Sequence, residues 1–226
     1  MFIPLYDQNP KVYVERPWVN QSLIVINLIV FAIQYVLPVA AENFVLVVMA
    51  VVPGWLGDPM IDQVPFLPDQ TTLVTYAFLH ADWMHVLSNM LFLFVFGDNI
   101  EDAMGHIRYL IFYLCCAAAG GFAHMLADPA STVPLVGASG AVAGVIAAYI
   151  LLYPKVRVFV LMRIIVPLPI PIPALYVLGL WVALQIFFVM FPDDGSVAWW
   201  AHIGGLIAGA TLVFFMKRSN VMMFGR

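Results

Sequence analysis

The sequence has few charged residues. Nine Lys and Arg and 13 Asp and Glu make up 10% of its 226 residues, whereas 64% of the residues are apolar and the mean hydropathy is +0.98. Water-soluble domains carry charge on about a quarter of their residues. The shortage of charge therefore excludes a soluble globular domain and predicts that the chain lies in a membrane.

Cysteine is also scarce. Cys115 and Cys116 are adjacent in an apolar stretch, and neighbouring side chains on a helix point about 100° apart, which disfavours a disulfide between them. The sequence contains no CxxC pair and no histidine–cysteine cluster with metal-site spacing. We expect no metal and no cofactor, and the net charge of −4 does not indicate a nucleic-acid partner.

The sequence is instead rich in long apolar segments. A spanning helix needs about 20 mostly apolar residues, and six windows meet this need while leaving little sequence for a soluble domain. The windows are 21–41, 83–101, 106–127, 137–154, 171–191 and 197–216. We predict an all-α membrane domain of six transmembrane helices over residues 21–216, with an N-terminal segment at 1–20 and a C-terminal tail at 217–226.

Two segments between the windows have a distinct character. The first connection, 42–82, is long and contains the apolar stretch 44–52. At about nine residues this stretch is too short to span, so we expect an interfacial or re-entrant segment. Proline alternates over residues 167–173, which excludes a regular helix there and marks the start of the fifth span.

The basic residues indicate the orientation of the spans, because Lys and Arg near span ends are retained on the cytoplasmic side. With six spans, one side carries Lys11, Arg16, Arg108, Lys155, Arg157, Arg163, Lys217, Arg218 and Arg226, which are all nine basic residues. The opposite loops carry Glu42, Asp58, Asp62, Asp69, Asp82, Asp128, Asp193 and Asp194, and no basic residue. Both termini are therefore predicted to be cytoplasmic.

Three predicted spans carry polar residues at a similar depth. Ser139 lies at the start of the fourth span and His202 near the start of the sixth, while His85 and Asn89 share one face of the second. All three spans start at the outer surface, which places these side chains within about 10 Å of it. An ionisable side chain in hydrocarbon costs roughly 2–3 kcal/mol or more, so the convergence indicates a function or a structural need.

A serine and a histidine at one depth can act as a nucleophile and its base. Serine alone is a poor nucleophile, but an imidazole within about 3 Å can take its proton during attack. The Ser139 amide, Asn89 and His85 are the available donors to an oxyanion. Glu101 and its acidic neighbours lie about 15–20 Å away at the cytoplasmic end. We therefore predict a Ser139–His202 dyad without a carboxylate.

Small residues on two of these spans favour close packing. Gly140 and Gly144 in the fourth span, and Gly205 and Gly209 in the sixth, each form a small-x-x-x-small pair. Such pairs allow two helix backbones to approach closely. A direct hydrogen bond between the serine and the histidine requires this approach.

The residues described so far resemble the rhomboid family of intramembrane serine proteases, over nearly the whole chain from the first span to the sixth. The similarity rests on motifs that occur in order and at matching depth. They are His80-x-x-x-x-His85-x-x-x-Asn89, Gly137-Ala138-Ser139-Gly140 and Ala201-His202-x-x-Gly205-x-x-x-Gly209. The segment Gly97-x-x-x-Glu101-x-x-x-Gly105 also resembles the family's end of the second span.

The resemblance implies a six-helix rhomboid bundle whose long first outer loop lies partly in the membrane and whose fifth helix controls lateral access. Ser139 would be the nucleophile, His202 the general base, and His85 and Asn89 oxyanion groups, while Glu101 would be structural. Structural or substrate-side roles would fall to His80, Gly137, Gly140, Gly205 and Gly209. The partners would be lipid and transmembrane protein substrates, in a bacterial plasma membrane.

The sequence departs from the family pattern at two places. Many members carry a Trp-Arg pair in the first loop, whereas Trp55 stands here without an arginine. Some members place an aromatic residue four positions after the serine, where this chain has Ala143. His202 must then pack against another residue, from the second or fifth helix. We expect Trp181 to face lipid and Trp199 to belong to an interfacial aromatic belt.

Other interpretations of these residues stay open at this point. Ser139 could be a small helix-packing residue, and His85 and Asn89 could bond neighbouring helices. The alternative function is that of an inactive relative that binds membrane clients, although such proteins lack the serine or the histidine. A transporter would need charge pairs or broken helices at the midplane, which the sequence does not indicate. The natural substrate and the oligomeric state are not predicted.

Overall fold

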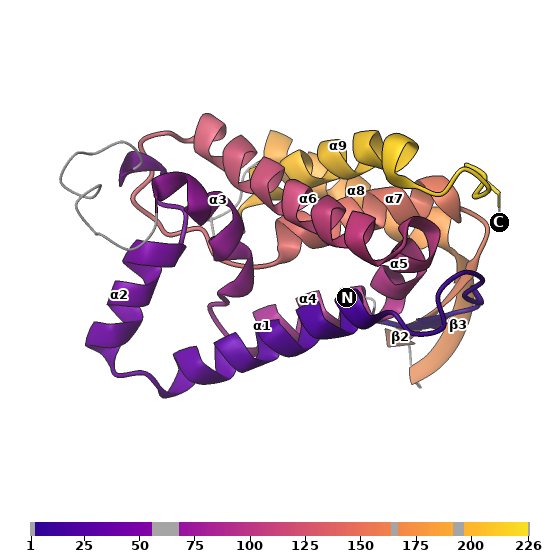
Figure 1. Ribbon diagram of the computed structural model, residues 1–226, viewed down its shortest axis with the longest axis horizontal. Coiled ribbons are helices and arrows are strands. Elements are labelled where there is room, and N and C mark those ends of the chain that lie inside the picture. Colours follow the sequence, from indigo (N-terminus) through magenta and orange to yellow (C-terminus); the bar gives the residue numbers. More distant parts are fainter. Residues whose placement is uncertain (1–2, 56–67, 164–166, 192–196, 226) are drawn as a thin grey trace.

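A computed structural model describes residues 3–55, 68–163, 167–191 and 197–225 of the chain. Within these ranges the protein is mostly helical (Figure 1), which confirms the predicted helical membrane bundle. Some acidic and basic residues used to predict the orientation lie outside the described residues, namely Asp58, Asp62, Asp193, Asp194 and Arg226.

The described residues form α-helices, short helical segments of other types, and strands. The α-helices are α1 (Trp18–Val36), α2 (Val39–Met49), α3 (Thr72–Thr75), α4 (Trp83–Phe92), α5 (Asp98–Met104), α6 (His106–Ala127), α7 (Ser139–Leu152), α8 (Ala174–Met190) and α9 (Trp199–Met216). The short 3₁₀ segments are η1 (Pro53–Trp55), η2 (Asp69–Thr71) and η3 (Tyr76–Phe78), and η4 (Leu93–Gly97) is π-helical. The strands are β1 (Ile3–Asp7), β2 (Arg157–Arg163) and β3 (Pro167–Pro173).

Each predicted window contains a helix. The bounds of α6 are those predicted, and α1, α7, α8 and α9 each overlap their windows. The second window is divided among α4, η4 and α5, which follow one another without a break and end at Met104. The apolar stretch of the first loop lies mostly in α2, an 11-residue helix of which no residue is buried.

Three of the described helices, α1, α6 and α9, are long and apolar enough to cross a membrane. The segments 69–78 and 83–104 together form a fourth candidate, bent by 86° at the break between them. Both α7 and α8 are apolar but shorter. The number of six spans therefore stays a prediction.

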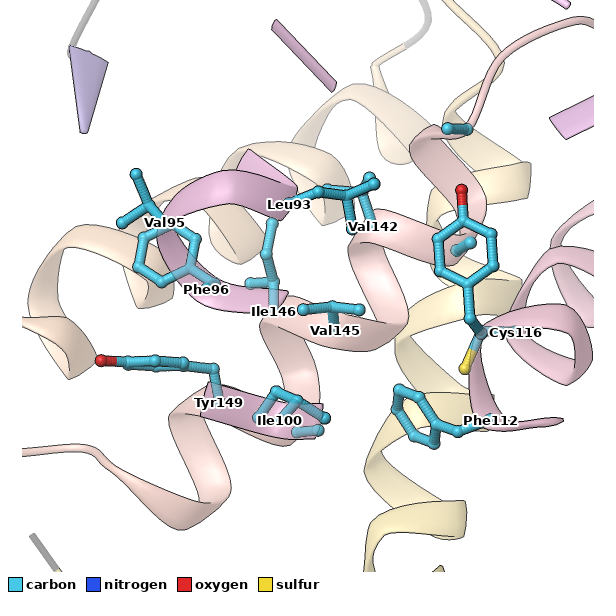
Figure 2. Close-up of a cluster of buried hydrophobic side chains, with 14 of the residues drawn as sticks. Leu93, Val95, Phe96, Ile100, Phe112, Cys116, Val142, Val145, Ile146 and Tyr149 are labelled. Carbon is cyan, nitrogen blue, oxygen red and sulfur yellow. The ribbon is translucent and has the colours of Figure 1, made fainter. Parts of the chain in front are cut away.

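The core of the bundle is built around α7, which is apolar on every side and buried along almost its whole length. A helix with this pattern belongs in an interior. Figure 2 shows Val142 and Ile146 of α7 beside Leu93 of η4, while Phe112 and Cys116 of α6 lie on the other side. Helices α6 and α9 also pack against each other and against α7, so Ser139 begins a helix that its neighbours enclose.

Glycines allow α7 and α9 to come within backbone contact. A Cβ atom built on Gly205 would lie 1.9 Å from the carbonyl oxygen of Gly140. One built on Gly209 would lie 2.3 Å from the carbonyl oxygen of Gly144. Because these obstacles are backbone atoms, no side chain can move aside to make room. The two glycine pairs thus fix the separation of the helices that carry Ser139 and His202.

A three-stranded antiparallel sheet of order β1-β2-β3 accompanies the helices and was not predicted. The alternating prolines form β3, whose register pairs Pro169, Pro171 and Pro173 with alternate residues of β2. Proline has no N–H, so the ladder uses the residues between the prolines and the prolines occupy the outer edge. An edge of this kind blocks the addition of another strand. Helix α8 begins directly afterwards, where the proline run predicts the fifth span to start.

Acidic residues at the end of α5 hold the N-terminal segment. The Glu101 carboxylate accepts hydrogen bonds from the backbone N–H groups of Val19, at 3.1 Å, and Asn20, at 2.7 Å, in the first turn of α1. It thereby satisfies N–H groups that lack partners within the helix and adds negative charge at the positive end of the helix dipole. The Asp102 carboxylate accepts from the backbone of residues 12–14. The two carboxylates thereby connect α5 to the N-terminal segment and to the start of α1.

Contacts at this end also hold the N-terminal and C-terminal segments against α5. Lys11 and Asp98 form an ion pair of 2.9 Å, and the backbone N–H of Arg218 donates to the carbonyl of Ala103 at 2.8 Å. The C-terminus, α5 and the sheet lie together at one end of the protein, opposite α2 and α3 (Figure 1). This end carries basic residues that the charge pattern assigns to the cytoplasm.

Asp7, the last residue of β1, connects the sheet to the helices. Its carboxylate accepts a hydrogen bond from Asn99 at 2.9 Å and another from the hydroxyl of Tyr149. Burial raises the pKa of the Asp7 carboxyl to about 6, and the nearby Asp98 carboxylate adds to this, while the bond from Tyr149 acts in the opposite direction.

This raised pKa predicts a pH-dependent stability. The folded state binds the Asp7 proton more tightly than the unfolded state does, so protonation of Asp7 raises the free energy of unfolding. This gain in stability is complete below the ordinary carboxyl pKa of about 4. It is lost as the pH rises through the folded-state pKa of about 6. We expect Asp7→Asn, which stays neutral, to remove this dependence. Unfolding free energies of both proteins in mixed micelles between about pH 4 and 7 test it. Parallel curves for the two proteins would contradict the prediction.

Candidate active site

Ser139 and His202 are in direct contact. Ser139 is the first residue of α7, and His202 lies in the first turn of α9. The hydroxyl Oγ of Ser139 lies 2.8 Å from Nε2 of His202, which is a hydrogen-bond distance. Ser139 is partly exposed, whereas His202 is buried. The bond joins the two helices whose backbones meet at the paired glycines.

The other ring nitrogen of His202 faces helix α8. Its Nδ1 lies 2.7 Å from Oε1 of Gln185. The rings of Trp181 and Trp199 lie beside the imidazole, with centroids 5.9 and 5.8 Å from its own. These two rings pack against the imidazole in a chain that has Ala143 where some family members carry an aromatic residue. One comes from the fifth helix, as expected, and the other from the first residue of α9.

His85 and Asn89 lie on α4, which contacts α7. The ring of His85 lies against Gly137, where a Cβ atom would come within 2.4 Å of His85 Nε2. Gly137 also has a φ of +119°, a conformation that favours glycine. Asn89 is buried, and its Nδ2 has no hydrogen-bond partner within the described part of the chain. An unpartnered buried donor on the helix that faces α7 is available to a bound ligand.

His80 lies just before α4 and connects several parts of the site. Its backbone N–H donates to Oε1 of Gln34 at 3.1 Å, and its Nε2 accepts from the backbone of Ala138 at 3.4 Å. Its ring lies 5.1 Å from that of His85, measured between centroids. His80 thus contacts the residue that precedes Ser139, which favours a structural role.

The position of Ser139 at the start of α7 adds an electrostatic feature. The first N–H groups of a helix have no intrahelical partners, and the helix dipole is positive at that end. An anion that forms beside the Ser139 hydroxyl would meet these N–H groups. The site thereby combines a nucleophile, a base and donors for negative charge.

The remaining predicted residues lie outside this cluster. Glu101 is at the opposite end of the bundle, where it pairs with His106 in addition to α1. Gly140, Gly205 and Gly209 lie at the α7–α9 contact. Among the residues that the structure describes, no group of three His, Cys, Asp or Glu side chains could hold a metal ion.

Sequence reasoning missed three residues around His202. Trp181 was expected to face lipid, but it is only partly exposed and its ring lies beside the imidazole. Trp199 was assigned to the aromatic belt. Gln185 was not singled out at all, although a lone amide in an apolar span was a usable signal. The rotation of α8 about its own axis decides which of its side chains face α9 and the site, and the sequence does not indicate that rotation.

Comparison with protein families identifies a match to the Rhomboid domain over residues 68–219, which is more than half of the chain. Rhomboid protein 1, mitochondrial, from Saccharomyces cerevisiae is 26% identical over 170 residues, covering 71% of this chain and 46% of the relative. Rhomboid-related protein 2 from Mus musculus is 32% identical over 145 residues, with coverage of 62% and 45%.

Rhomboid-like protease 3 from Toxoplasma gondii is 28% identical over 147 residues, with coverage of 65% of this chain and 51% of the relative. The chain thus spans about half the length of these relatives. The matched region nevertheless contains every residue of the cluster around Ser139 and His202. Since the family match covers most of the helical bundle, this multi-pass membrane protein belongs to the rhomboid family.

Proposed function

We propose that the protein is an intramembrane serine endopeptidase that cleaves transmembrane segments of other membrane proteins near the outer membrane surface. The 2.8 Å hydrogen bond between Ser139 Oγ and His202 Nε2 carries this proposal. Membership of the rhomboid family and the name of the Toxoplasma relative, a protease, support it.

In the first step Ser139 Oγ attacks the scissile carbonyl carbon, and His202 Nε2 takes the hydroxyl proton as the C–O bond forms. The carbonyl oxygen becomes an oxyanion. When this intermediate collapses, the C–N bond breaks and His202 returns the proton to the leaving amine. The products are a free amine and an ester between the substrate and Ser139.

The oxyanion requires donors that are already in place. We assign this role to the N–H groups at the start of α7, to Nδ2 of Asn89 and to His85. The Asn89 amide supports the assignment, because this buried donor has no partner among the described residues and is free to donate to the oxyanion. Loss of one such donor typically lowers the rate by about 10²–10³.

Water completes the reaction by attacking the ester. His202 takes a proton from the water, and the C–O bond to Ser139 then breaks with return of that proton to Oγ. The partial exposure of Ser139 supports access of water from one side. A shallow position below the outer surface shortens the path that water must follow through the protein.

We place this chemistry in a six-span bundle with residues 1–20 and 217–226 in the cytoplasm, in a bacterial plasma membrane. The basic residues at the sheet end of the protein support this orientation. A substrate helix must unwind partly to expose its carbonyl group, because an intact helix keeps that group in its own hydrogen bonds. Preferred substrates should therefore have helix-breaking residues near the outer surface.

The substrate requirement gives the test of this proposal. Purified protein in lipid vesicles is mixed with single-span substrates that differ only by Gly-Ala, Ala-Ala or Leu-Leu in the outer third of the helix. We expect cleavage to be fastest with Gly-Ala and slowest with Leu-Leu, with a cut near the outer surface by mass spectrometry. Failure to cut any of them, with folded protein, would refute the proposal and favour binding of membrane clients.

A further inference from the structure

Gln185 is an unusual residue for its position in α8. The helix is otherwise apolar or aromatic, and most of its residues are exposed or partly exposed at the surface of the bundle. Gln185 is one of four buried residues in α8 and is 4% exposed. An amide in an apolar span lowers stability unless both of its ends are hydrogen-bonded. Gln185 meets this condition, with His202 as one of its partners.

The direction of each hydrogen bond can be deduced from one fixed acceptor. The backbone carbonyl of Trp181 can only accept, so the group 2.9 Å away must be the NH₂ of Gln185. The Gln185 carbonyl then faces His202 and can itself only accept. The imidazole nitrogen at 2.7 Å must therefore carry a proton, which makes Nδ1 the protonated nitrogen of neutral His202.

The same deduction continues to the serine. With its proton on Nδ1, neutral His202 has an electron pair on Nε2, and this nitrogen accepts from the Ser139 hydroxyl at 2.8 Å. The serine cannot impose this arrangement, because a hydroxyl both donates and accepts. The backbone of Trp181 thus sets the direction of the whole chain of hydrogen bonds through Gln185.

We propose that Gln185 is a positioning residue that holds His202 in the tautomer and orientation that let it accept the Ser139 proton. The inference rests on the proposed protease function and extends it from a dyad to a Ser139–His202–Gln185 triad with a neutral third member. Gln185 touches neither the reacting atoms nor the nucleophile and acts through the imidazole. It takes the place that a carboxylate has in soluble serine proteases.

The triad also connects catalysis to the position of α8. Both Gln185 and the Trp181 ring reach His202 from this one helix. A displacement of α8 away from α9 would break the bond to Nδ1 and remove the ring beside the imidazole together. His202 is consequently aligned only while α8 is packed against α9.

Substitutions separate positioning from packing. Gln185→Met keeps the length and volume of the side chain but removes both the acceptor and the donor. Gln185→Glu in its neutral form keeps the pattern, because its hydroxyl can donate to Trp181 while its carbonyl accepts from His202. Ile186→Met is the matched control, since it places a methionine beside Gln185 on the exposed side of α8.

The direct test is a nitrogen NMR spectrum of the histidine rings in protein labelled with ¹⁵N-histidine. The chain has five histidines, and His202→Ala identifies the signals of interest. We expect only the Nδ1–H tautomer of His202 in the wild type and in Ile186→Met, and a mixture of tautomers in Gln185→Met. An Nε2–H tautomer in the wild type would overturn the proposal without any variant, as would an unchanged spectrum in Gln185→Met.

Cleavage kinetics in vesicles provide the second readout. We expect Gln185→Met to lower kcat by about 10²-fold with little change in KM, as for a misplaced catalytic group, and Gln185→Glu to recover activity to within about tenfold of the wild type. A rise in KM alone, or equal losses in Gln185→Glu and Gln185→Met, would indicate packing and overturn the proposal. If the wild type does not cleave at all, the protease function fails, while the spectrum still decides whether Gln185 sets the tautomer.

Discussion

Replacing Gly205 with alanine is expected to destabilise the folded protein strongly, although it adds a single methyl group. The new Cβ would lie 1.9 Å from the carbonyl oxygen of Gly140 and 2.8 Å from its carbonyl carbon. Helices α7 and α9 must then separate, which breaks close contacts along their whole interface. We expect the unfolding free energy to fall by about 3 kcal/mol or more, a large fraction of a typical total of 5–15 kcal/mol. Unfolding in mixed micelles measures this loss.

Gly179→Ala is the matched control for this substitution. Gly179 lies in α8, and a Cβ atom there would have nothing within 4 Å. Because alanine favours helix more than glycine does, this change should be neutral or stabilise by up to about 1 kcal/mol. Equal stability of the two alanine variants would show that α7 and α9 are not packed as described. In Gly205→Ala, residual folded protein should also cleave more slowly, because the helices that carry Ser139 and His202 move apart.

Replacing His202 with alanine is expected to lower the cleavage rate by about 10⁶-fold, as for the loss of a serine protease base. Without the imidazole, the described part of the chain has no other group hydrogen-bonded to the Ser139 hydroxyl that could take its proton. Ser139→Ala should be equally inactive, and the double variant no worse than either single one, because the two residues act as a unit. Initial rates in vesicles, with each variant checked for folding, measure these effects.

The two substitutions differ in their effect on structure, which separates catalysis from folding. His202→Ala leaves the Gln185 carbonyl buried without its partner, so some loss of stability is expected. Ser139 lies at the start of its helix and is partly exposed, so Ser139→Ala should remain close to the wild type in stability. Rapid cleavage by either folded variant would contradict the assigned roles.

The sequence was informative about the fold where its pattern extends over many residues. Long apolar windows predict helices well, because a helix in lipid must satisfy its own backbone hydrogen bonds. The bounds of α6 illustrate this. The strand β3 was not predicted, because alternating prolines exclude a helix without indicating a strand. Its partner β2 lies just before it in the chain, but residues 157–163 carry no pattern that indicated a strand there.

The candidate site could be predicted to the extent that residue type and depth determine it. Ser139 and His202 were singled out because polar groups are rare in apolar spans. The partners of His202 could not be found in this way, because Gln185, Trp181 and Trp199 reach the ring only through the rotation of α8 and the start of α9. Depth places a residue along a helix, but packing decides the direction in which its side chain points.

The central claim is that His202 makes Ser139 a nucleophile, and covalent trapping tests it most directly. A fluorophosphonate reacts when serine oxygen attacks phosphorus, the P–F bond breaks and fluoride leaves, while the base takes the serine proton. Intact-mass measurement and peptide mapping of protein in vesicles should find one adduct, on Ser139, in the wild type. The adduct should form much more slowly in folded His202→Ala and not at all in Ser139→Ala. An adduct on another residue, or equal labelling of the wild type and His202→Ala, would contradict the account.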